Sequence, residues 1–339
     1  MKAAIAENGT IRIDDVDVPD PGVGEVQIKV AAAGLNAADK GLITGQYIRG
    51  TSITKPTSAA AIAGPIRFGM EVSGIVTAVG ADVSGTKVGD EVMARSGGAF
   101  AEYVVTPAAD VLAKPADLSF TDAAAVPVTF ITAHDALSTL GGLQPGQHVL
   151  VNAVSSGVGV AALQLAKLLG AATVIGTARN RDRLTDLVEH GIAVDLALDT
   201  ADPQIIDKVL DATGGHGVDV IIDSVGSPEW AQHLQMLAIG GRLVSVGRSG
   251  GTSAEVDLDE VARKRVSIIG ATFRTRSREE TSAVVRRAAD VIVDGFAAGK
   301  LKVVVDRVFP LAQVAQAESW MTSGKRIGKV IVEMPTSEH

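Results

Sequence analysis

The sequence predicts an α/β protein of two domains, an irregular β-barrel and a doubly wound parallel sheet. Short strand-like runs separated by glycine turns fill the first part of the chain. Apolar strands that alternate with helices follow. A glycine-rich turn also joins the first of those strands to a helix. We assign residues 1–122 and 275–339 to the barrel domain and residues 123–274 to the parallel-sheet domain.

The composition limits the class of protein. The 339 residues are enough for two domains, and an apolar content of 46% indicates a globular chain. The net charge of −8 argues against a nucleic-acid partner. The absence of cysteine excludes disulfides, thiolate metal sites and a cysteine nucleophile. Neither a signal-peptide pattern nor an apolar run of ~20 residues occurs, so we expect a cytoplasmic protein without a membrane partner.

The barrel domain is predicted from period-two alternation and turn residues. Residues 11–16 and 25–30 alternate between apolar and polar side chains, which is typical of strands with one buried face. Further strands are expected at 70–80, 88–93, 100–105, 303–308 and 329–333. The stretch 51–65 is rich in Thr, Ser and Ala and predicts a loop.

The parallel-sheet domain is predicted from apolar runs between helices. A helix is expected over 121–140, with a break or kink at Pro127. Six strands are expected at 149–153, 173–177, 196–198, 218–223, 242–246 and 266–273. A long helix at 277–299 then leads back to the barrel.

The turn after the first of these strands predicts a dinucleotide site. Gly157, Gly159 and Ala162 fit the G-x-G-x-x-G/A pattern, whose small residues let the backbone approach a pyrophosphate. The following helix directs its N-terminal amides and positive dipole end at the phosphates. The expected phosphate-binding residues are Ser156, Gly157, Val158 and Gly159. A small-residue turn used only for packing is the alternative.

The end of the second strand indicates which dinucleotide is preferred. An NAD site has Asp or Glu there, whereas this chain has Thr177, Arg179, Arg181 and Arg183. A guanidinium binds phosphate oxygens in pairs, so we predict NADPH, with its 2′-phosphate on Arg179 and Arg183. The alternative is that these arginines form a solvated helix start.

Several stretches occur in the order found in one known family. They are Ala33–Asp39 (AGLNAAD), Phe68–Val76 (FGMEVSGIV), Val88–Val92 (VGDEV), Gly98–Tyr103 (GAFAEY), the glycine turn, Asp223–Gly226 (DSVG), Gly240–Val244 (GGRLV) and Ile327–Val330 (IGKV). With them the chain resembles the medium-chain dehydrogenase/reductase superfamily, in its zinc-free quinone oxidoreductase (zeta-crystallin-like) branch. The resemblance implies a GroES-like barrel beside a Rossmann domain. Zinc-dependent members carry a cysteine near the position of Asn36, so no metal is expected here.

The resemblance also implies roles for individual residues. Asn36 would lie beside the nicotinamide and bond a substrate carbonyl, and the Tyr47 hydroxyl would bond the same oxygen or donate a proton. The alternatives are that Asn36 caps a helix starting near Ala37, which is compatible with the first role, and that Tyr47 packs over 51–65. Asp39 is interpreted as a helix-face partner and His134 as structural.

The expected contacts to the nicotinamide end come from several elements. They are Thr132, the strand-end residues Val246, Gly247 and Arg248, and then Phe273, Thr275 and Lys329. Strand ends are where open α/β sheets bind ligands. Thr132 bonded to its own helix backbone and Lys329 exposed on a strand remain the alternative interpretations.

Together these features predict hydride transfer from NADPH to a quinone or an α,β-unsaturated carbonyl, a small-molecule substrate. Hydrogen bonds from Asn36 and Tyr47 would stabilise the developing negative charge on oxygen. The alternatives are an enoyl-thioester reductase of the same superfamily, and an NADPH-binding protein with a structural or redox-sensing role. The strand Val266–Phe273 would be an exposed apolar edge, so we expect a homodimer paired along it.

Overall fold

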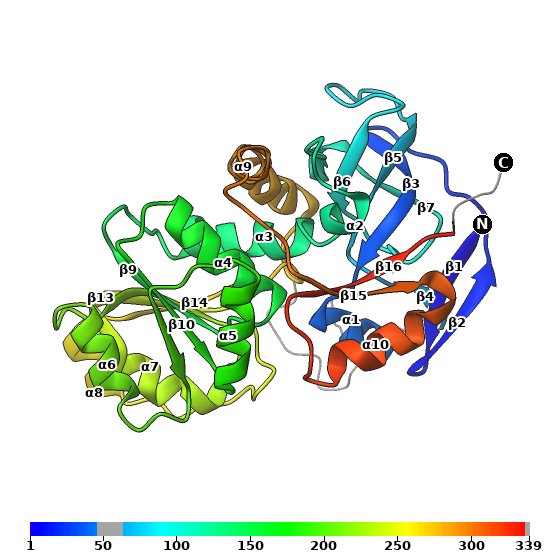
Figure 1. The fold of residues 1–339 in the computed structure, drawn as a ribbon. Coiled ribbons are helices and arrows are strands. Elements are labelled where there is room, and N and C mark those ends of the chain that lie inside the picture. Colours follow the sequence, from blue (N-terminus) through cyan, green and yellow to red (C-terminus); the bar gives the residue numbers. More distant parts are fainter. Residues whose placement is uncertain (46–63, 336–339) are drawn as a thin grey trace. The chain divides into compact units, whose positions relative to one another are not determined.

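The computed structural model describes residues 1–45 and 64–335 and divides into two compact units (Figure 1). Unit 1 comprises Met1–Ile131, Phe273–Gly299 and Val303–His339, and unit 2 comprises Thr132–Thr272 and Lys300–Lys302. The first boundary falls inside helix α3 (Pro127–His134) rather than at the change of sequence pattern after residue 122. The reason is that the first turn of α3 is bonded to unit 1, where the Val128 N–H donates to the Glu71 carboxylate at 2.7 Å.

Unit 1 is built on a seven-stranded sheet and a three-stranded sheet. The larger sheet has the order β15 (Val305–Pro310), β16 (Lys329–Glu333), β3 (Glu25–Gly34), β5 (Glu71–Val79), β6 (Glu91–Arg95) and β8 (Val111–Ala113), with β7 (Tyr103–Pro107) paired to β3. The smaller sheet has the order β2 (Thr10–Asp15), β1 (Lys2–Glu7) and β4 (Ile66–Arg67). Gly74 marks a close approach of two strands, since a Cβ there would lie 2.1 Å from the Lys29 carbonyl oxygen.

The helices of unit 1 differ at their starts, where Ser119 and Ser277 supply hydroxyl caps and Gln313 supplies none. They are α1 (Ala37–Ile43), α2 (Phe120–Ala123), α9 (Arg278–Ala297) and α10 (Val314–Thr322), with short 3₁₀ turns η1 (Ala108–Asp110) and η4 (Leu311–Gln313). The capping box of α9 fixes its start: the Ser277 hydroxyl accepts the Glu280 N–H at 3.1 Å and the Glu280 carboxylate accepts the Ser277 N–H at 2.7 Å. The helix expected over 121–140 is broken at Pro127, as predicted, and consists of α2, α3 and a π-helical segment η2 (Asp135–Leu140).

Unit 2 is a six-stranded parallel sheet with the order expected of a dinucleotide-binding domain. Its strands run β11 (Leu196–Asp199), β10 (Thr173–Ala178), β9 (His148–Asn152), β12 (Val218–Asp223), β13 (Leu237–Ser245) and β14 (Ser267–Gly270). The order reverses between β9 and β12, and this switch point is where such sheets bind ligands. β14 is shorter than the expected strand 266–273 because its partner β13 ends at Ser245, which pairs with Gly270.

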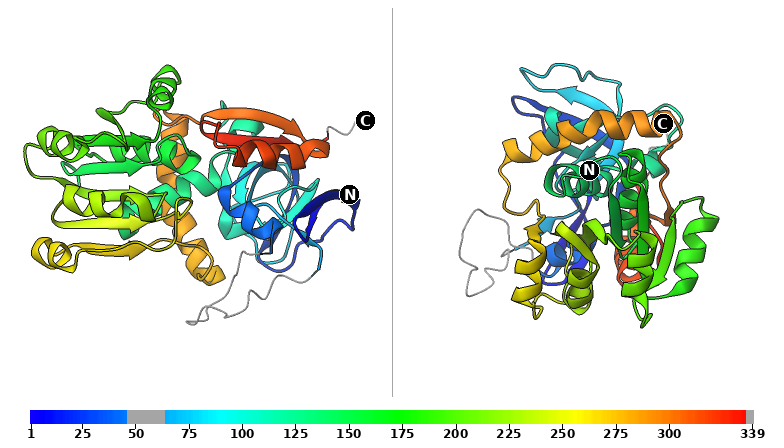
Figure 2. Two further views of the ribbon diagram at one scale, coloured as in Figure 1. Left: turned by 90° about the horizontal axis from the view of Figure 1, so that it is seen from below. Right: turned by 90° about the vertical axis from the view of Figure 1, so that its left-hand side faces the viewer.

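Helices cover both faces of this parallel sheet (Figure 2). One face carries α4 (Gly157–Leu168) and α5 (Arg181–Glu189), and the other carries α6 (Ile205–Ala212), α7 (Trp230–Met236) and α8 (Leu258–Lys264). The apolar strand β9 is therefore enclosed, with Val149, Leu150 and Val151 fully buried. Within the described ranges, no helix is long and apolar enough to cross a membrane.

Candidate functional site

The turn between β9 and α4 has the geometry of a phosphate-binding turn. Ala153 adopts a left-handed φ of 59°, which turns the chain sharply after the strand. The Ser156 hydroxyl accepts the Gly159 N–H at 3.0 Å and donates to the Ala153 carbonyl at 2.8 Å. A Cβ on Gly159 would lie 2.4 Å from that same carbonyl oxygen, so only glycine fits. The first N–H groups of α4, at Gly157 and Val158, point out of the helix end and can bind an anion.

The end of β10 presents an arginine to solvent. Thr177 is only 1% exposed, and its hydroxyl donates to the Asn152 side-chain oxygen at 2.8 Å, which ties β10 to β9. Arg179 follows the strand and is exposed, and Asn180 caps α5 by accepting the Asp182 N–H at 2.8 Å. Arg183 is half-buried in the first turn of α5. A phosphate near this strand end would meet positive charge.

The ends of β12 and β13 are held together by backbone bonds. The N–H groups of Val246 and Gly247 both donate to the Asp223 carbonyl, at 2.8 and 3.1 Å. A Cβ on Gly247 would lie 2.4 Å from the Ser224 carbonyl oxygen, so the close approach of the two segments requires glycine. Arg248 follows and is exposed.

A buried carboxylate organises this region of unit 2. Asp223 accepts hydrogen bonds from Asn152 Nδ2 at 3.1 Å, from Trp230 Nε1 at 2.8 Å and from the Gly226 N–H at 3.1 Å. His233 lies in the same buried cluster, where desolvation lowers its pKa to about 4. Burial raises the pKa of neighbouring Glu229, with the charge of Asp223 adding to the shift. Asp223 therefore fixes the turn that follows β12.

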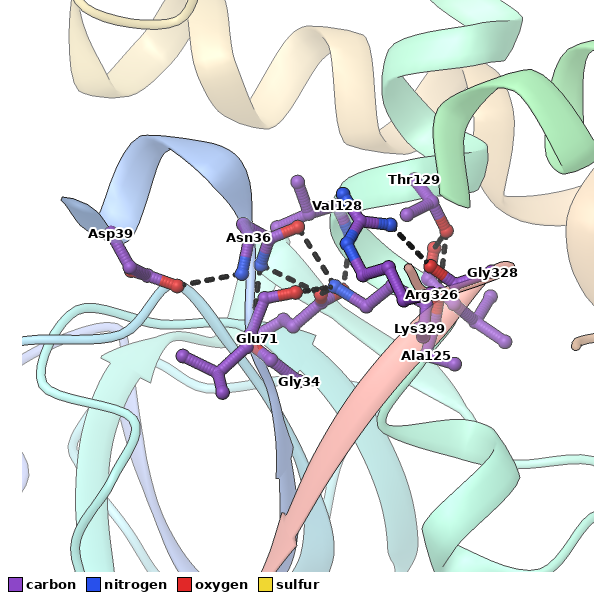
Figure 3. A network of polar contacts seen from close by, with 12 residues as sticks. Gly34, Asn36, Asp39, Glu71, Ala125, Val128, Thr129, Arg326, Gly328 and Lys329 are labelled. Atoms are coloured by element: carbon purple, nitrogen blue, oxygen red, sulfur yellow. Dashed lines mark hydrogen bonds and ion pairs between the residues drawn. The ribbon is translucent and has the colours of Figure 1, made fainter. Parts of the chain in front are cut away.

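In unit 1, a polar network surrounds Asn36 at the end of β3 (Figure 3). Its Nδ2 donates to Glu71 Oε1 at 2.8 Å and to the Gly34 carbonyl at 3.2 Å. Its Oδ1 accepts from Lys329 Nζ at 2.9 Å, and its backbone N–H donates to Asp39 Oδ2 at 2.8 Å. Both side-chain hydrogens of Asn36 are thus engaged within the protein. A substrate oxygen could bind to Nδ2 only by replacing one of these two acceptors.

Lys329 and Glu71 form a buried ion pair at the centre of this network. Lys329 is 5% exposed and Glu71 is fully buried, and Nζ lies 2.5 Å from Oε1. Lys329 also donates to the Leu35 carbonyl at 2.5 Å. Burial lowers the pKa of Lys329, and the charge of Glu71 opposes that shift. The alternative interpretation of Lys329 as an exposed strand lysine is therefore wrong: β16 pairs with β3 and carries Lys329 inward.

Asp39 is the second carboxylate of the network. It is fully buried, and desolvation raises its pKa to about 7. The Asn36 N–H and the charge of Lys329 lower that pKa, while Glu71 raises it. Near neutral pH the Asp39 carboxyl is therefore divided between its protonated and ionised forms.

The remaining predicted residues lie in several places. Tyr47 falls outside the described residues. Thr132 is half-buried in α3, and His134 is buried in the same helix, where desolvation lowers its pKa. Phe273 and Thr275 line a cavity within unit 1. Among the described residues, no group of three or more His, Asp or Glu side chains could hold a metal ion.

Sequence reasoning gave no role to Glu71 or Asp223, the two acceptors on which these networks depend. A signal for both was present. Each is a carboxylate at one end of a largely apolar strand, Glu71 at the start of β5 and Asp223 at the end of β12. A charge that is buried in such a strand must be paired or hydrogen-bonded.

Comparison with known proteins establishes the family. A family model described as alcohol dehydrogenase GroES-like domain matches residues 22–116, and one described as zinc-binding dehydrogenase matches residues 157–290. The quinone oxidoreductase of Lama guanicoe is 33% identical over 321 residues, which cover 94% of this chain and 91% of that protein. The chain belongs to the medium-chain dehydrogenase/reductase superfamily. Within it, the chain is a quinone oxidoreductase-like protein, as the resemblance implied.

Other similar proteins extend the comparison. A phenolphthiocerol/phthiocerol polyketide synthase of Mycobacterium tuberculosis is 31% identical over 327 residues, which are 96% of this chain but only 14% of that protein. The crystal structure of an NAD-dependent alcohol dehydrogenase has a TM-score of 0.82 at 31% identity and covers 99% of this chain and 100% of its own. A mycobacterial structure complexed with NADPH has a TM-score of 0.82 at 28% identity, and the match covers 98% of this chain and 100% of that one. The CurK enoyl reductase has a TM-score of 0.79 at 30% identity, and the match covers 98% of this chain and 99% of that one. These matches confirm the expected combination of a GroES-like domain and a parallel-sheet domain.

Proposed function

We propose that this protein is an NADPH-dependent reductase that transfers hydride to a quinone or an α,β-unsaturated carbonyl. The observation that carries the proposal is Arg179, which follows β10 and is exposed where NAD-binding proteins have a carboxylate. The family membership and a similar structure whose name includes NADPH support the same choice.

The chain's residues would hold the dinucleotide along the carboxyl edge of the parallel sheet. The N–H groups of Gly157 and Val158 bind the pyrophosphate, and the close packing at Gly159 keeps them aligned. Arg179 and Arg183 bind the 2′-phosphate through charged hydrogen bonds. Thr132 and the segment 246–248 hold the nicotinamide end. When bound, NADPH supplies the hydride.

The network around Asn36 would stabilise the negative charge that develops on the substrate oxygen. The Lys329 ammonium at 2.9 Å from Oδ1 polarises the amide and strengthens Nδ2 as a donor. The bond from Nδ2 to the Gly34 carbonyl, at 3.2 Å, is the longer of its two bonds and is the one that a substrate oxygen would replace. Lys329 therefore acts as a positioning residue, and Tyr47 is the second proposed donor.

Steady-state oxidation of NADPH and of NADH tests the proposal, with a quinone and an enone as acceptors. The wild-type protein is expected to favour NADPH. Arg179→Gln should lower kcat/KM for NADPH by about 10- to 100-fold, the loss of one charged hydrogen bond, and change kcat/KM for NADH little. Arg287→Gln, which removes an exposed arginine from α9, is the matched control. Higher efficiency of the wild type with NADH, or inactivity with both acceptors, contradicts the proposal.

A second candidate function is the reduction of an enoyl thioester. It is favoured by the similarity to the mycobacterial polyketide synthase over 96% of this chain and by the similarity to the CurK enoyl reductase. The same hydride would reach a double bond conjugated to a thioester carbonyl. The values of kcat/KM for an enoyl thioester and for a simple enone decide between the two candidates. A higher value for the thioester favours enoyl-thioester reduction, and a higher value for the enone favours the first proposal.

A further inference from the structure

The network around Asn36 buries two carboxyl groups and one ammonium group (Figure 3). Asp39 and Glu71 are both fully buried, and Lys329 is 5% exposed. If all three groups were ionised, two carboxylates would share one cation. A buried charge without its own partner costs far more free energy than a buried neutral group. One of the two carboxyl groups should therefore keep its proton.

The hydrogen bonds indicate which carboxyl group that is. Glu71 accepts from Asn36 Nδ2 at 2.8 Å and from the Val128 N–H at 2.7 Å, and it pairs with Lys329 at 2.5 Å. Asp39 Oδ2 accepts the Asn36 N–H at 2.8 Å, but Asp39 Oδ1 is buried and has no hydrogen-bond partner among the described residues. Donated hydrogen bonds stabilise the ionised form of a carboxyl group. Glu71 is therefore the ionised carboxylate, and Asp39 is the group that keeps the proton.

The influences on Asp39 agree with this assignment. Burial is the largest of them and raises its pKa to about 7. The Asn36 N–H and the charge of Lys329 lower that pKa, and the charge of Glu71 raises it. The Gly69 N–H has the smallest effect and lowers it. The charges that shift the pKa of Asp39 thus belong to the same network.

Other charged groups lie on the elements around it. Helix α10 and strand β1 also pack against α1, which carries Asp39, and they meet it in the apolar core of unit 1. The charged residues on these two elements are Lys2 and Glu7, each held in an ion pair of its own, and Glu318. The charge of Arg326 acts on Lys329, and its guanidinium donates to the Gly328 carbonyl at 2.7 Å. Protonation of Asp39 therefore decides the net charge of the network.

That net charge matters for the negative charge that the proposed reduction creates. With Asp39 protonated, the charges of Lys329 and Glu71 cancel. With Asp39 ionised, the network carries one additional negative charge, bonded to the backbone of Asn36. Asn36 Nδ2 is the proposed donor to the substrate oxygen. A negative charge buried beside this donor repels the charge that develops on that oxygen, and the low dielectric of the interior strengthens the repulsion.

We propose that Asp39 is a proton-controlled positioning residue: reduction proceeds while its carboxyl group is protonated and is suppressed when that group ionises. The proton stays on Asp39 during the reaction, so the residue acts through Asn36 and not as an acid. The control of reduction rests on the proposed reductase function, but the protonation of Asp39 does not.

Infrared spectroscopy tests for the proton without turnover. The C=O stretch of protonated carboxyl groups is followed in the full chain as the pH rises from about 5 to about 9. Burial also raises the pKa of Asp110 and of Glu229, so the same pH-difference spectrum of Asp39→Asn is subtracted. The remainder should be one carboxyl band that disappears near pH 7. Identical difference spectra in the two proteins would show that Asp39 does not titrate in this range and would overturn the proposal.

The pH dependence of turnover tests the control of reduction. With saturating NADPH and an enone that does not ionise, wild-type kcat/KM should fall about tenfold per pH unit above about pH 7. Asp39→Asn cannot ionise and keeps an oxygen acceptor for the Asn36 N–H, so this fall should disappear. Asp207→Asn, at an exposed aspartate in the first turn of α6, is the matched control and should retain the fall.

The kinetic outcomes are distinct. A fall that persists in Asp39→Asn would assign the ionisation to another group, such as Lys329, and would overturn the proposal. A flat wild-type profile across the same range would overturn it without any variant. Inactivity with every acceptor at every pH would reject the proposed function and the control of it, while the infrared titration would still show whether Asp39 holds the proton.

Discussion

At the scale of single residues, the buried pair of Lys329 and Glu71 explains the position of Asn36. Burying two charges costs free energy that their attraction alone repays only in part. Here the cost is offset by further hydrogen bonds, from Asn36 Nδ2 and the Val128 N–H to Glu71 and from Lys329 to the Leu35 carbonyl. The ion pair thus fixes the side-chain amide of Asn36 in one orientation.

Removing one partner should therefore cost much more than removing both. Lys329→Met leaves the Glu71 carboxylate buried without its cation, and we expect a loss of about 3–5 kcal/mol in the free energy of unfolding. The double variant Glu71→Gln with Lys329→Met should recover part of that loss, since an amide is easier to bury than a charge. Urea denaturation of the four proteins gives the coupling free energy.

The control for this cycle is Lys87→Met, which removes an exposed lysine of unit 1 and should change stability little. Additive losses in the double variant would contradict the coupling. So would a Lys329→Met protein as stable as the wild type.

Asp39 should make the free energy of unfolding fall as the pH rises from about 4 to about 7. Burial raises its pKa from 3.8 to about 7, so the folded chain holds this proton more tightly than the unfolded chain. Its contribution to stability is full below about pH 4 and is lost as the pH rises to about 7. Relative to Asp39→Asn, which keeps an acceptor for the Asn36 N–H, wild type should lose up to about 1.4 kcal/mol per pH unit across this range.

Urea unfolding of wild type and Asp39→Asn across the same pH range measures this difference. The variant is the necessary reference because His233, whose pKa burial lowers to about 4, makes stability change in the opposite direction over part of the range. Parallel curves for the two proteins would show that Asp39 ionises as it does in the unfolded chain.

At the scale of elements, the proposed cofactor binding depends on close packing at the junction of β9 and α4. A Cβ at position 159 would lie 2.4 Å from the Ala153 carbonyl oxygen and 2.6 Å from the Val154 Cα, both backbone atoms that cannot rotate away. Gly159→Ala should displace the start of α4 and weaken NADPH about tenfold or more, measured by fluorescence titration. Gly97→Ala is the matched control, since a Cβ there meets nothing within 4 Å. Equal affinity in both variants would contradict the role of the turn.

Element types could be predicted from the sequence where a pattern is local. The apolar run of β12 and the capping box of α9 each fix a boundary within a few residues. Boundaries that depend on a partner could not be predicted in this way. β14 stops at Gly270 because β13 stops at Ser245, and that pairing joins segments far apart in the sequence.

At the scale of the whole molecule, the same distinction separates the fold from the candidate site. The parallel sheet covered by helices follows from the alternation of helices and strands and was predicted. The pairing of Lys329 with Glu71 joins β16 to β5 across a sequence separation of 258 residues, and no local pattern indicates that these charges meet. The arginines around the cavity that Phe273 and Thr275 line likewise come from β6, from the segment before α9 and from the first residue of α9. Side chains brought together by the fold are what sequence reasoning missed.

The edge strands of the two large sheets bear on how the chain assembles. β14 ends the order of the parallel sheet, and Ile268 on it is 42% exposed; β15 ends the other large sheet, and Val308 on it is 44% exposed. An exposed apolar edge strand invites pairing with a second copy, and we expect a homodimer through β14. Ile268→Lys should then convert the dimer to a monomer in light scattering, whereas Val308→Lys, the same change on the other edge, should leave the dimer intact. Dissociation by Val308→Lys alone would show that the interface lies at β15. A monomeric wild type would show that the chain does not dimerise.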